Sequence, residues 1–255
     1  MKKWLTAALC LLMLFTQESY SATKQIAITI DDLPFVGART YSEGNKRREH
    51  ARFLKLIEAL DTYHVPTTGF VIAGQIGKSG GELLDLFTEH GYFIGNHTFT
   101  HPKLSQSNAD KYIAEIEKAD AVLTPRIKAT RYFRYPYLAE GAGETKVRVQ
   151  EVLARLNYVV APVTVDSKDF QFNAQFMSIP WRARPAHLNS MKKCYLGYIW
   201  AQTLRAEKKA EKKGLPDKQI LLLHANVLNS LFLGDILKMY KDNGYKFISL
   251  DEALK

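Results

Sequence analysis

The chain has 255 residues, of which 46% are hydrophobic, and a formal net charge of +9. A chain of this length and apolar content can bury one large core or two small ones. The positive charge favours attraction to anionic envelope polymers such as the cell wall. Nucleic acid is disfavoured as a partner, because no recognised binding motif is present and much of the charge lies in one run, Lys208 to Lys213.

Residues 1–21 have the order of a secretory signal peptide, with positive residues, then an apolar stretch, then small residues. Two lysines precede the apolar stretch from Trp4 to Phe15, and Ser21 stands before Ala22. About twelve apolar residues are too few to span a bilayer, so we expect no stable membrane anchor. The sequence therefore predicts cleavage near Ser21 and a soluble protein that is periplasmic or secreted.

Cleavage of the signal peptide changes the charge and the cysteine content of the chain. It removes Lys2, Lys3 and Glu18, which lowers the formal charge from +9 to +8. It also removes Cys10 and leaves Cys194 as the only cysteine, so no internal disulfide can form. Cys194 lacks the flanking signature of a thiol nucleophile, and we expect it to be structural.

The first predicted strand, residues 24–30, has the β-branched and apolar pattern of a strand buried on both faces. It leads directly into Asp31 and Asp32. Two adjacent carboxylates at the end of a buried strand are unfavourable unless positive charge lies opposite them. A helix N-cap or a solvated turn is the alternative, although Leu33 and Pro34 follow and no clean helix begins there.

After a loop over 36–45, the next predicted elements are a helix over 46–63, a strand over 67–73, a helix over 82–90 and a short strand over 92–95. His97 and His101 follow that strand at once. In a single helical turn their Cβ atoms lie roughly 5–6 Å apart on one face, and Pro102 ends the turn. Chance or plain packing also produces such a pair. With Asp32, however, it makes two neutral nitrogens and one carboxylate, the ligand set of a catalytic zinc site with an open position.

The remaining predicted elements are a helix over 109–123, a strand over 131–134, a helix over 146–156, strands over 158–165 and 219–223, a helix over 228–241 and a last strand over 245–250. Residues 172–214 interrupt this alternation, because they are long for a βα connection and end in a Lys/Glu-rich helix. We predict an insertion with a solvated end there. The alternative is that Trp181 and Trp200 grip substrate.

The alternation of strands and helices predicts a mainly parallel α/β sheet. About seven strands fit a closed or nearly closed barrel of TIM type better than an open sheet. Several polar residues lie at or just past the carboxyl end of a predicted strand, the rim where an α/β barrel holds its catalytic residues. These residues are Asp31, Asp32, His97, Arg134, Asp166, Asp169 and His224.

Together these segments resemble the polysaccharide deacetylases, the NodB-homology enzymes of carbohydrate esterase family 4. The likeness is carried, in the family's order, by Thr29-Ile30-Asp31-Asp32, His97-Thr98-Phe99-Thr100-His101, Arg134-Tyr135-Pro136-Tyr137, Asp166-Ser167-Lys168-Asp169-Phe170 and Leu221-Leu222-Leu223-His224. The resemblance implies an α/β fold, a distorted TIM-like (β/α)7 barrel in a single domain over 22–255. Residues 172–214 would be an insertion between the fifth and sixth motif-bearing strands. It also implies removal of acetyl groups from N-acetylated sugars.

The resemblance implies a metal-dependent reaction. Asp32, His97 and His101 would bind one divalent ion, usually zinc, with cobalt or another ion as an alternative. Asp31 resembles the general base, since a neighbouring carboxylate can take a proton from water that a divalent ion has activated. Arg134 resembles the arginine that pairs with this base, and a cation there stabilises the carboxylate.

The same resemblance assigns the leaving-group side of the site. His224 looks like the general acid that protonates the amine, and Asp169 like the carboxylate that raises its basicity. Leu222 lies two residues from His224 on a strand, so both point to one face and Leu222 would line the acetyl pocket. The backbone N–H of Tyr137 would help to hold the oxyanion, and Phe170 would form an apolar wall.

Three departures from the family pattern bear on the substrate. Phe170 stands where tryptophan is usual, Ala225-Asn226 follows the histidine where an aspartate is common, and the insertion is longer than the usual connection. None of them removes a proposed ligand, base or acid. The chemistry is therefore expected to be retained, and the departures bear only on which substrate is used.

We expect a metal-dependent deacetylase that acts on N-acetyl groups of an envelope glycan and works as a monomer. The signal peptide and positive charge favour peptidoglycan amino sugars over chitin-type oligosaccharides. An O-acetyl esterase on xylan or a similar polymer would use the same residues. The third alternative, a non-catalytic glycan-binding protein, would lack a base or a ligand, and none is missing.

Overall fold

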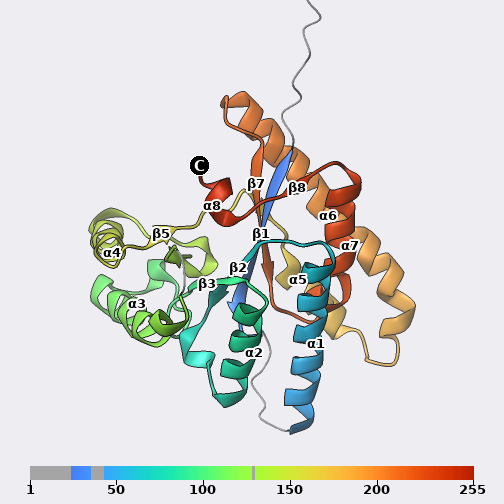
Figure 1. The fold of residues 1–255 in the computed structure, drawn as a ribbon, viewed down its shortest axis with the longest axis horizontal. Helices are drawn as coiled ribbons and strands as arrows, with labels where there is room; N and C mark the ends of the chain where they lie inside the picture. The colour runs from blue at the N-terminus through green and yellow to red at the C-terminus, as the bar shows by residue number, and fades with distance from the viewer. Residues whose placement is uncertain (1–23, 36–42, 128–129) are drawn as a thin grey trace, which may run out of the picture.

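The computed structural model of the chain describes residues 24–35, 43–127 and 130–255 (Figure 1). The predicted signal peptide, with its cleavage site, lies outside the described residues and stays a prediction. Most of the predicted loop over 36–45 lies outside them too. Among the helices in the described ranges, none combines the length and the apolar character that crossing a membrane requires.

Parallel strands lie on both sides of a central strand, β1 (Gln25–Leu33), which runs through the middle of Figure 1. The strand order is β5-β4-β3-β2-β1-β7-β6. β1 pairs with β2 (Thr67–Val71) on one side and with β7 (Lys218–His224) on the other. The other strands are β3 (Phe93–Asn96), β4 (Tyr132–Phe133), β5 (Val159–Val160), β6 (Val165–Asp166) and β8 (Lys246–Phe247), which pairs with the start of β1. Because β5 and β6 follow each other in the chain but form the two edges of the sheet, the barrel is open between them.

Helices lie around this sheet, as Figure 1 shows. They are α1 (Glu43–Thr62), α2 (Lys78–Glu89), α3 (Ala109–Leu123), α4 (Gly143–Arg155), α5 (Asp169–Ser178), α6 (Arg184–Lys212), α7 (Asn229–Asp242) and α8 (Leu250–Ala253), with short 3-10 helices at Ala73–Gln75, Leu104–Gln106, Thr124–Arg126 and Pro136–Leu138. The predicted fold class is confirmed. The chain forms one α/β domain, a distorted (β/α)7 barrel.

The two faces of β1 explain how the barrel is filled, because successive side chains of a strand point to opposite sides. Ile26, Ile28 and Ile30 are at most 2% exposed and join the main core between the sheet and the helices. Ala27 belongs to a separate cluster on the inner face, which also contains Phe70, Tyr132, Ala161, Ile220, Ile248 and Leu250. The barrel is thus packed with apolar side chains, and its polar residues lie beyond them at the carboxyl end of β1.

The strands expected over 67–73 and 131–134 are shorter than predicted, and two further strands differ more. The strand expected over 158–165 is divided into β5 and β6, and Pro162 lies in the break. Proline has no N–H for a ladder and is confined to edges and irregularities of sheets. The strand expected over 245–250 is only β8, because Ser249 caps α8 in a capping box with Glu252.

The segment 172–214 contains most of α5 and all of α6. α6 buries Met191, Tyr195, Ile199 and Thr203, which recur at helical spacing and form one apolar stripe. Trp200 packs edge-on against Tyr240 and Tyr245. Tyr245 directly precedes β8, which pairs with the first residues of β1, so Trp200 lies away from the end of β1 that carries Asp31.

Candidate metal and catalytic site

β1 delivers two successive carboxylates to the same end of the barrel because its strand geometry is interrupted. The register between β1 and β2 shifts between Ile30 and Leu33, and Asp32 has a φ of 61°. In a regular strand neighbouring side chains point to opposite faces, whereas a bulge re-aims one of them. As a result Asp31 Oδ2 and Asp32 Oδ1 lie 3.8 and 3.5 Å from the same atom, Nε2 of His97.

The segment from His97 to His101 is a short turn directly after β3, as the sequence predicts, but the turn is irregular and not helical. Thr98 and His101 have φ values of 67° and 63°, which a helix does not contain. Side chains stabilise this turn: Asn96 Oδ1 accepts from the Thr98 N–H at 2.8 Å, and Thr98 Oγ1 accepts from the His101 N–H at 3.1 Å. The two imidazole rings nevertheless converge, with centroids 4.9 Å apart.

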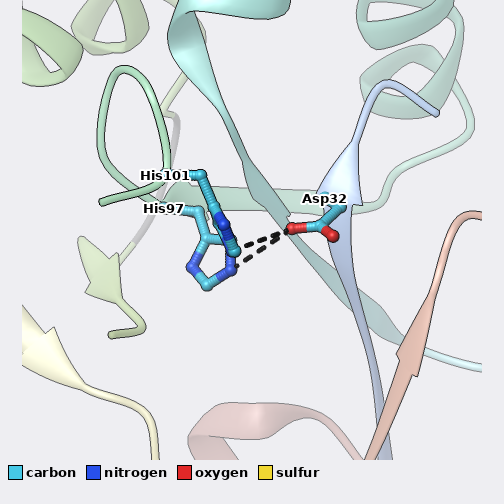
Figure 2. Close-up of side chains that lie close together, drawn as sticks. All are labelled: Asp32, His97 and His101. Carbon is cyan, nitrogen blue, oxygen red and sulfur yellow. Dashed lines mark ion pairs between the residues drawn. The ribbon is translucent and has the colours of Figure 1, made fainter. Parts of the chain in front are cut away.

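Asp32, His97 and His101 form the cluster that the sequence predicts for a metal (Figure 2). One ligand atom from each lies within 4.8 Å of the others, and Asp32 Oδ1 is 3.5 Å from His97 Nε2 and 3.3 Å from His101 Nε2. Asp32 Oδ1 is buried and has no hydrogen-bond partner among the described residues. A buried carboxylate oxygen is unfavourable without a partner, and a cation between these three side chains would supply one.

The protonation of the two histidines suits the same role. Burial lowers the pKa of His97 and that of His101 to about 3, so both imidazoles are neutral at physiological pH. His97 Nδ1 lies 2.7 Å from the backbone oxygen of Arg134 and, as a donor, leaves Nε2 free to bind a metal. Burial also raises the pKa of Asp32 to about 6, and a bound cation would favour its ionised form. These residues fit a divalent metal.

Asp31 is held by Arg134 in a buried ion pair. Arg134 Nη1 donates to Asp31 Oδ1 and to Thr29 Oγ1, both at 2.7 Å, and the two charged side chains are only 1% and 3% exposed. The other guanidinium nitrogens donate to the backbone oxygens of Ala161 and Pro162 at 3.3 and 3.2 Å. The break between β5 and β6 thus supplies acceptors that a paired strand would have used in its ladder.

The opposite side of the site contains a histidine paired with a carboxylate. His224 Nδ1 lies 2.6 Å from Oδ1 of Asp169, which is fully buried at the start of α5. Burial alone would lower the pKa of His224, but the charge of Asp169 and the hydrogen bond to it outweigh burial and raise the pKa to about 10. His224 is therefore protonated at neutral pH and can donate a proton from Nε2.

The three residues predicted to contact substrate lie beside these groups. Tyr137 has a φ of 58° and is 64% exposed, and its ring lies 4.6 Å from that of His101. Phe170 is 50% exposed and meets the His224 ring edge-on at 6.3 Å. Leu222 is paired in register with Thr29 of β1 and points to the same side of β7 as His224. Trp181, the alternative substrate contact, is 71% exposed in the turn between α5 and α6.

The structure brings together all ten residues proposed from the sequence, and it adds several that the sequence analysis missed. Thr29 orients Arg134 and could have been found, because it lies two residues before Asp31 on the same face of the strand. Asn96 shapes the histidine turn. Asn226 and Asn229 donate to Asp169, and no sequence pattern near His224 marks Asn229 as a partner.

Known proteins resemble this chain over part or most of its length. A family profile described as polysaccharide deacetylase matches residues 19–161. The chain is 26% identical over 118 residues to a peptidoglycan-N-acetylglucosamine deacetylase of Bacillus cereus, an alignment that covers 46% of this chain and 41% of that protein. It is 25% identical over 201 residues to the peptidoglycan-N-acetylmuramic acid deacetylase PdaA of Bacillus subtilis, with 78% and 65% covered. The chain thus covers less than two thirds of the length of either relative.

Among solved structures, similarity extends over nearly the whole described chain. A mutant of a CE4 family pseudoenzyme from Bacillus anthracis, with restored enzymatic activity, superposes with a TM-score of 0.63. The match covers 91% of this chain and 68% of the other at 18% sequence identity. At that identity the match shows that the two chains share a fold.

Proposed function

Because the chain belongs to the polysaccharide deacetylase family, we propose that it is a metal-dependent hydrolase that removes N-acetyl groups from an envelope glycan. The observation that carries the proposal is the buried cluster of Asp32, His97 and His101, in which Asp32 Oδ1 has no hydrogen-bond partner in the described structure. Zinc is the proposed ion, since two imidazoles and one carboxylate with an open position are its usual catalytic ligands. Cobalt or another divalent ion is the alternative.

When bound, the divalent ion supplies Lewis-acid chemistry, lowering the pKa of water and polarising the acetyl carbonyl. Asp31 takes a proton from the water whose oxygen attacks the carbonyl carbon. Arg134 pairs with Asp31 and holds its carboxylate in place through the 2.7 Å hydrogen bond. The backbone N–H of Tyr137 is the proposed donor to the oxyanion.

The second half of the reaction breaks the amide C–N bond. His224 donates a proton to the leaving nitrogen, which departs as the free amine of the sugar while the acetyl group leaves as acetate. The buried Asp169 keeps His224 protonated and fixes its ring, because it pairs with Nδ1 and leaves Nε2 to face the substrate. Asp31 and His224 oppose each other in register on β1 and β7, so base and acid flank one position.

Three observations support peptidoglycan amino sugars as the substrate and chitin-type oligosaccharides as the next choice. Both relatives described above are named for peptidoglycan deacetylation. The exposed rings of Tyr137 and Phe170 flank the site and can pack against sugar rings. The formal charge, +9 for the whole chain, favours anionic envelope polymers. Export through the cleaved signal peptide, to the periplasm or the medium, is part of the proposal.

The test is acetate release from peptidoglycan, chitooligosaccharides and acetylxylan by the purified mature protein, with and without a chelator. We expect chelator-sensitive release from peptidoglycan. Release from acetylxylan alone would make the protein an O-acetyl esterase. A metal-loaded protein that binds glycan and releases no acetate from any polymer would be a non-catalytic binding protein, and the proposed function would be wrong.

A further inference from the structure

Asp169 is fully buried, and its carboxylate is surrounded by hydrogen-bond donors. Besides its bond to the His224 ring, it accepts at Oδ2 from the His224 backbone N–H at 2.6 Å, from Asn226 Nδ2 at 3.0 Å and from Asn229 Nδ2 at 2.5 Å. A buried carboxylate is unfavourable without such partners. Two of the four donors are side-chain amides, whose orientation must itself be maintained.

Asn229 makes the bonds that fix its own orientation. Its Nδ2 donates both to Asp169 Oδ2 and to the backbone oxygen of His224, the latter at 2.9 Å. Its Oδ1 accepts from the hydroxyl of Tyr195 at 2.8 Å. If the side-chain amide were rotated by 180°, Oδ1 would face the Asp169 carboxylate and the His224 carbonyl, and neither of these groups can donate a hydrogen bond. Asp169 and the His224 carbonyl thus set the orientation of the amide, and the Tyr195 hydroxyl, as donor to Oδ1, holds its other end in place.

Tyr195 comes from α6, the long helix of the insertion, and is 0% exposed. Its ring packs against Phe172 of α5, the helix that begins with Asp169, at 5.1 Å. The insertion thus contacts the site from the protein interior, through the buried side of α6. A chain of hydrogen bonds runs from its buried face through Asn229 on α7 to Asp169 and His224.

We propose that Tyr195 and Asn229 are positioning residues, which hold the Asp169 carboxylate in the orientation that His224 requires to protonate the leaving amine. The inference rests on the proposed function for the role of His224, and it adds a role for the insertion. On this account α6 supports the catalytic pair from the protein interior, and its sequence can vary on the exposed face without loss of turnover.

Tyr195→Phe removes only the hydroxyl group that donates to Asn229 Oδ1. Tyr240→Phe is the matched control. Tyr240 is also 0% exposed, and its hydroxyl lies 2.7 Å from Thr203 Oγ1 on the same helix α6. Each variant therefore loses a buried hydroxyl that bonds between α6 and α7. The Tyr195 hydroxyl also bonds to Ser167, two residues before Asp169, so its loss acts on the same carboxylate by both routes.

Removing a residue that hydrogen-bonds to a metal ligand typically changes activity by roughly 10–100-fold. Tyr195 acts on His224 only through intervening residues, so we expect a smaller effect, a fall of about five- to tenfold in kcat for acetate release. KM is expected within about twofold of wild type, and Tyr240→Phe within about twofold in both constants.

A second measurement needs no substrate. The Nδ1 proton of His224 lies in a short hydrogen bond to Asp169, so its NMR resonance is expected far downfield and sensitive to the position of the carboxylate. We expect this resonance to move in Tyr195→Phe and not in Tyr240→Phe. If it moves as expected while no polymer is deacetylated, the positioning role stands and the proposed function falls.

Other results would overturn the positioning role of Tyr195 and Asn229 without affecting the proposed deacetylase function. Wild-type kcat and an unmoved His224 resonance in Tyr195→Phe, or equal effects in Tyr195→Phe and Tyr240→Phe, would overturn the positioning role and leave the deacetylase proposal intact. If Tyr195→Phe does not fold, Asn229→Asp provides the test, since it still accepts from Tyr195 but faces Asp169 with a carboxylate. A fall in kcat at least as large as that expected for Tyr195→Phe would support the inference, and a wild-type rate would overturn it.

Discussion

Replacing Arg134 by methionine tests the buried ion pair on which the proposed base depends. Methionine keeps an apolar stem but removes every donor of the guanidinium. Asp31, which is 2% exposed, then loses its cationic partner, and Thr29 Oγ1 loses the bond at 2.7 Å. The backbone oxygens of Ala161 and Pro162, at the open edge of the barrel, lose their donors as well.

The magnitude follows from burial. Removing one partner of a buried ion pair leaves an uncompensated charge and typically costs about 3–5 kcal/mol. An exposed pair gives the scale for comparison: Arg155 and Glu117 lie 2.7 Å apart with side chains 66% and 46% exposed, and such pairs contribute about 0–1 kcal/mol. Arg134→Met should therefore lower the free energy of unfolding several times more than Arg155→Met.

The assay is urea denaturation of the metal-free protein, with the double variant Asp31→Asn/Arg134→Met included. Because the double variant removes the unpaired charge together with the arginine, we expect it to be more stable than Arg134→Met alone. A loss below about 1 kcal/mol in Arg134→Met would refute the reasoning, since a buried pair cannot be that weakly coupled. Strict additivity of Asp31→Asn and Arg134→Met in the double variant would refute it too.

Further expected outcomes concern the base, the ligands, the barrel interior and the acid. Asp31→Asn should abolish acetate release but keep bound metal by elemental analysis, whereas unchanged turnover would remove Asp31 from the base role. His97→Ala should lose the metal itself, and full occupancy in that variant would contradict the ligand set. Gly95→Ala should destabilise the protein by about 1–3 kcal/mol in thermal unfolding, because its new Cβ would lie 2.8 Å from both the Phe70 ring and the backbone oxygen of Tyr132. A neutral effect would contradict this packing of β3 against its neighbours. Since the folded-state pKa of His224 is raised to about 10, its contribution to stability is complete below pH 6.5 and lost as the pH rises towards 10. His224→Asn should flatten that part of the stability profile, and an unchanged slope would count against the raised pKa.

The parts of the site that follow strands were predictable, because parallel strands bring their carboxyl ends to one rim. Asp31 and Asp32 follow an apolar strand, and His97 and His224 do the same on other strands. Strand period and chain order were enough to place these residues together. The boundaries of α3, predicted over 109–123, are also confirmed, since its apolar spacing is regular and Asn108 caps it.

The parts that tertiary contacts decide were not predictable. The turn from His97 to His101 adopts positive φ values because Asn96 and Thr98 provide alternative hydrogen bonds to the backbone, which spacing alone does not reveal. Pro162 marks the break between β5 and β6 in the sequence. That Arg134 donates to the backbone oxygens of Ala161 and Pro162 there depends on a contact between distant parts of the chain, which the sequence does not reveal. The bond between Tyr195 and Asn229 joins residues 34 apart on different helices, with no local pattern to signal it.

The most direct test of the central claim is acetate release from purified peptidoglycan by protein stripped of metal and then titrated with zinc. We predict no release from the stripped protein, recovery that saturates at one ion per chain, and no recovery in Asp31→Asn at the same zinc content. Acetate release that is undiminished after metal removal would contradict the account. So would a zinc-loaded wild-type protein that releases no acetate from peptidoglycan.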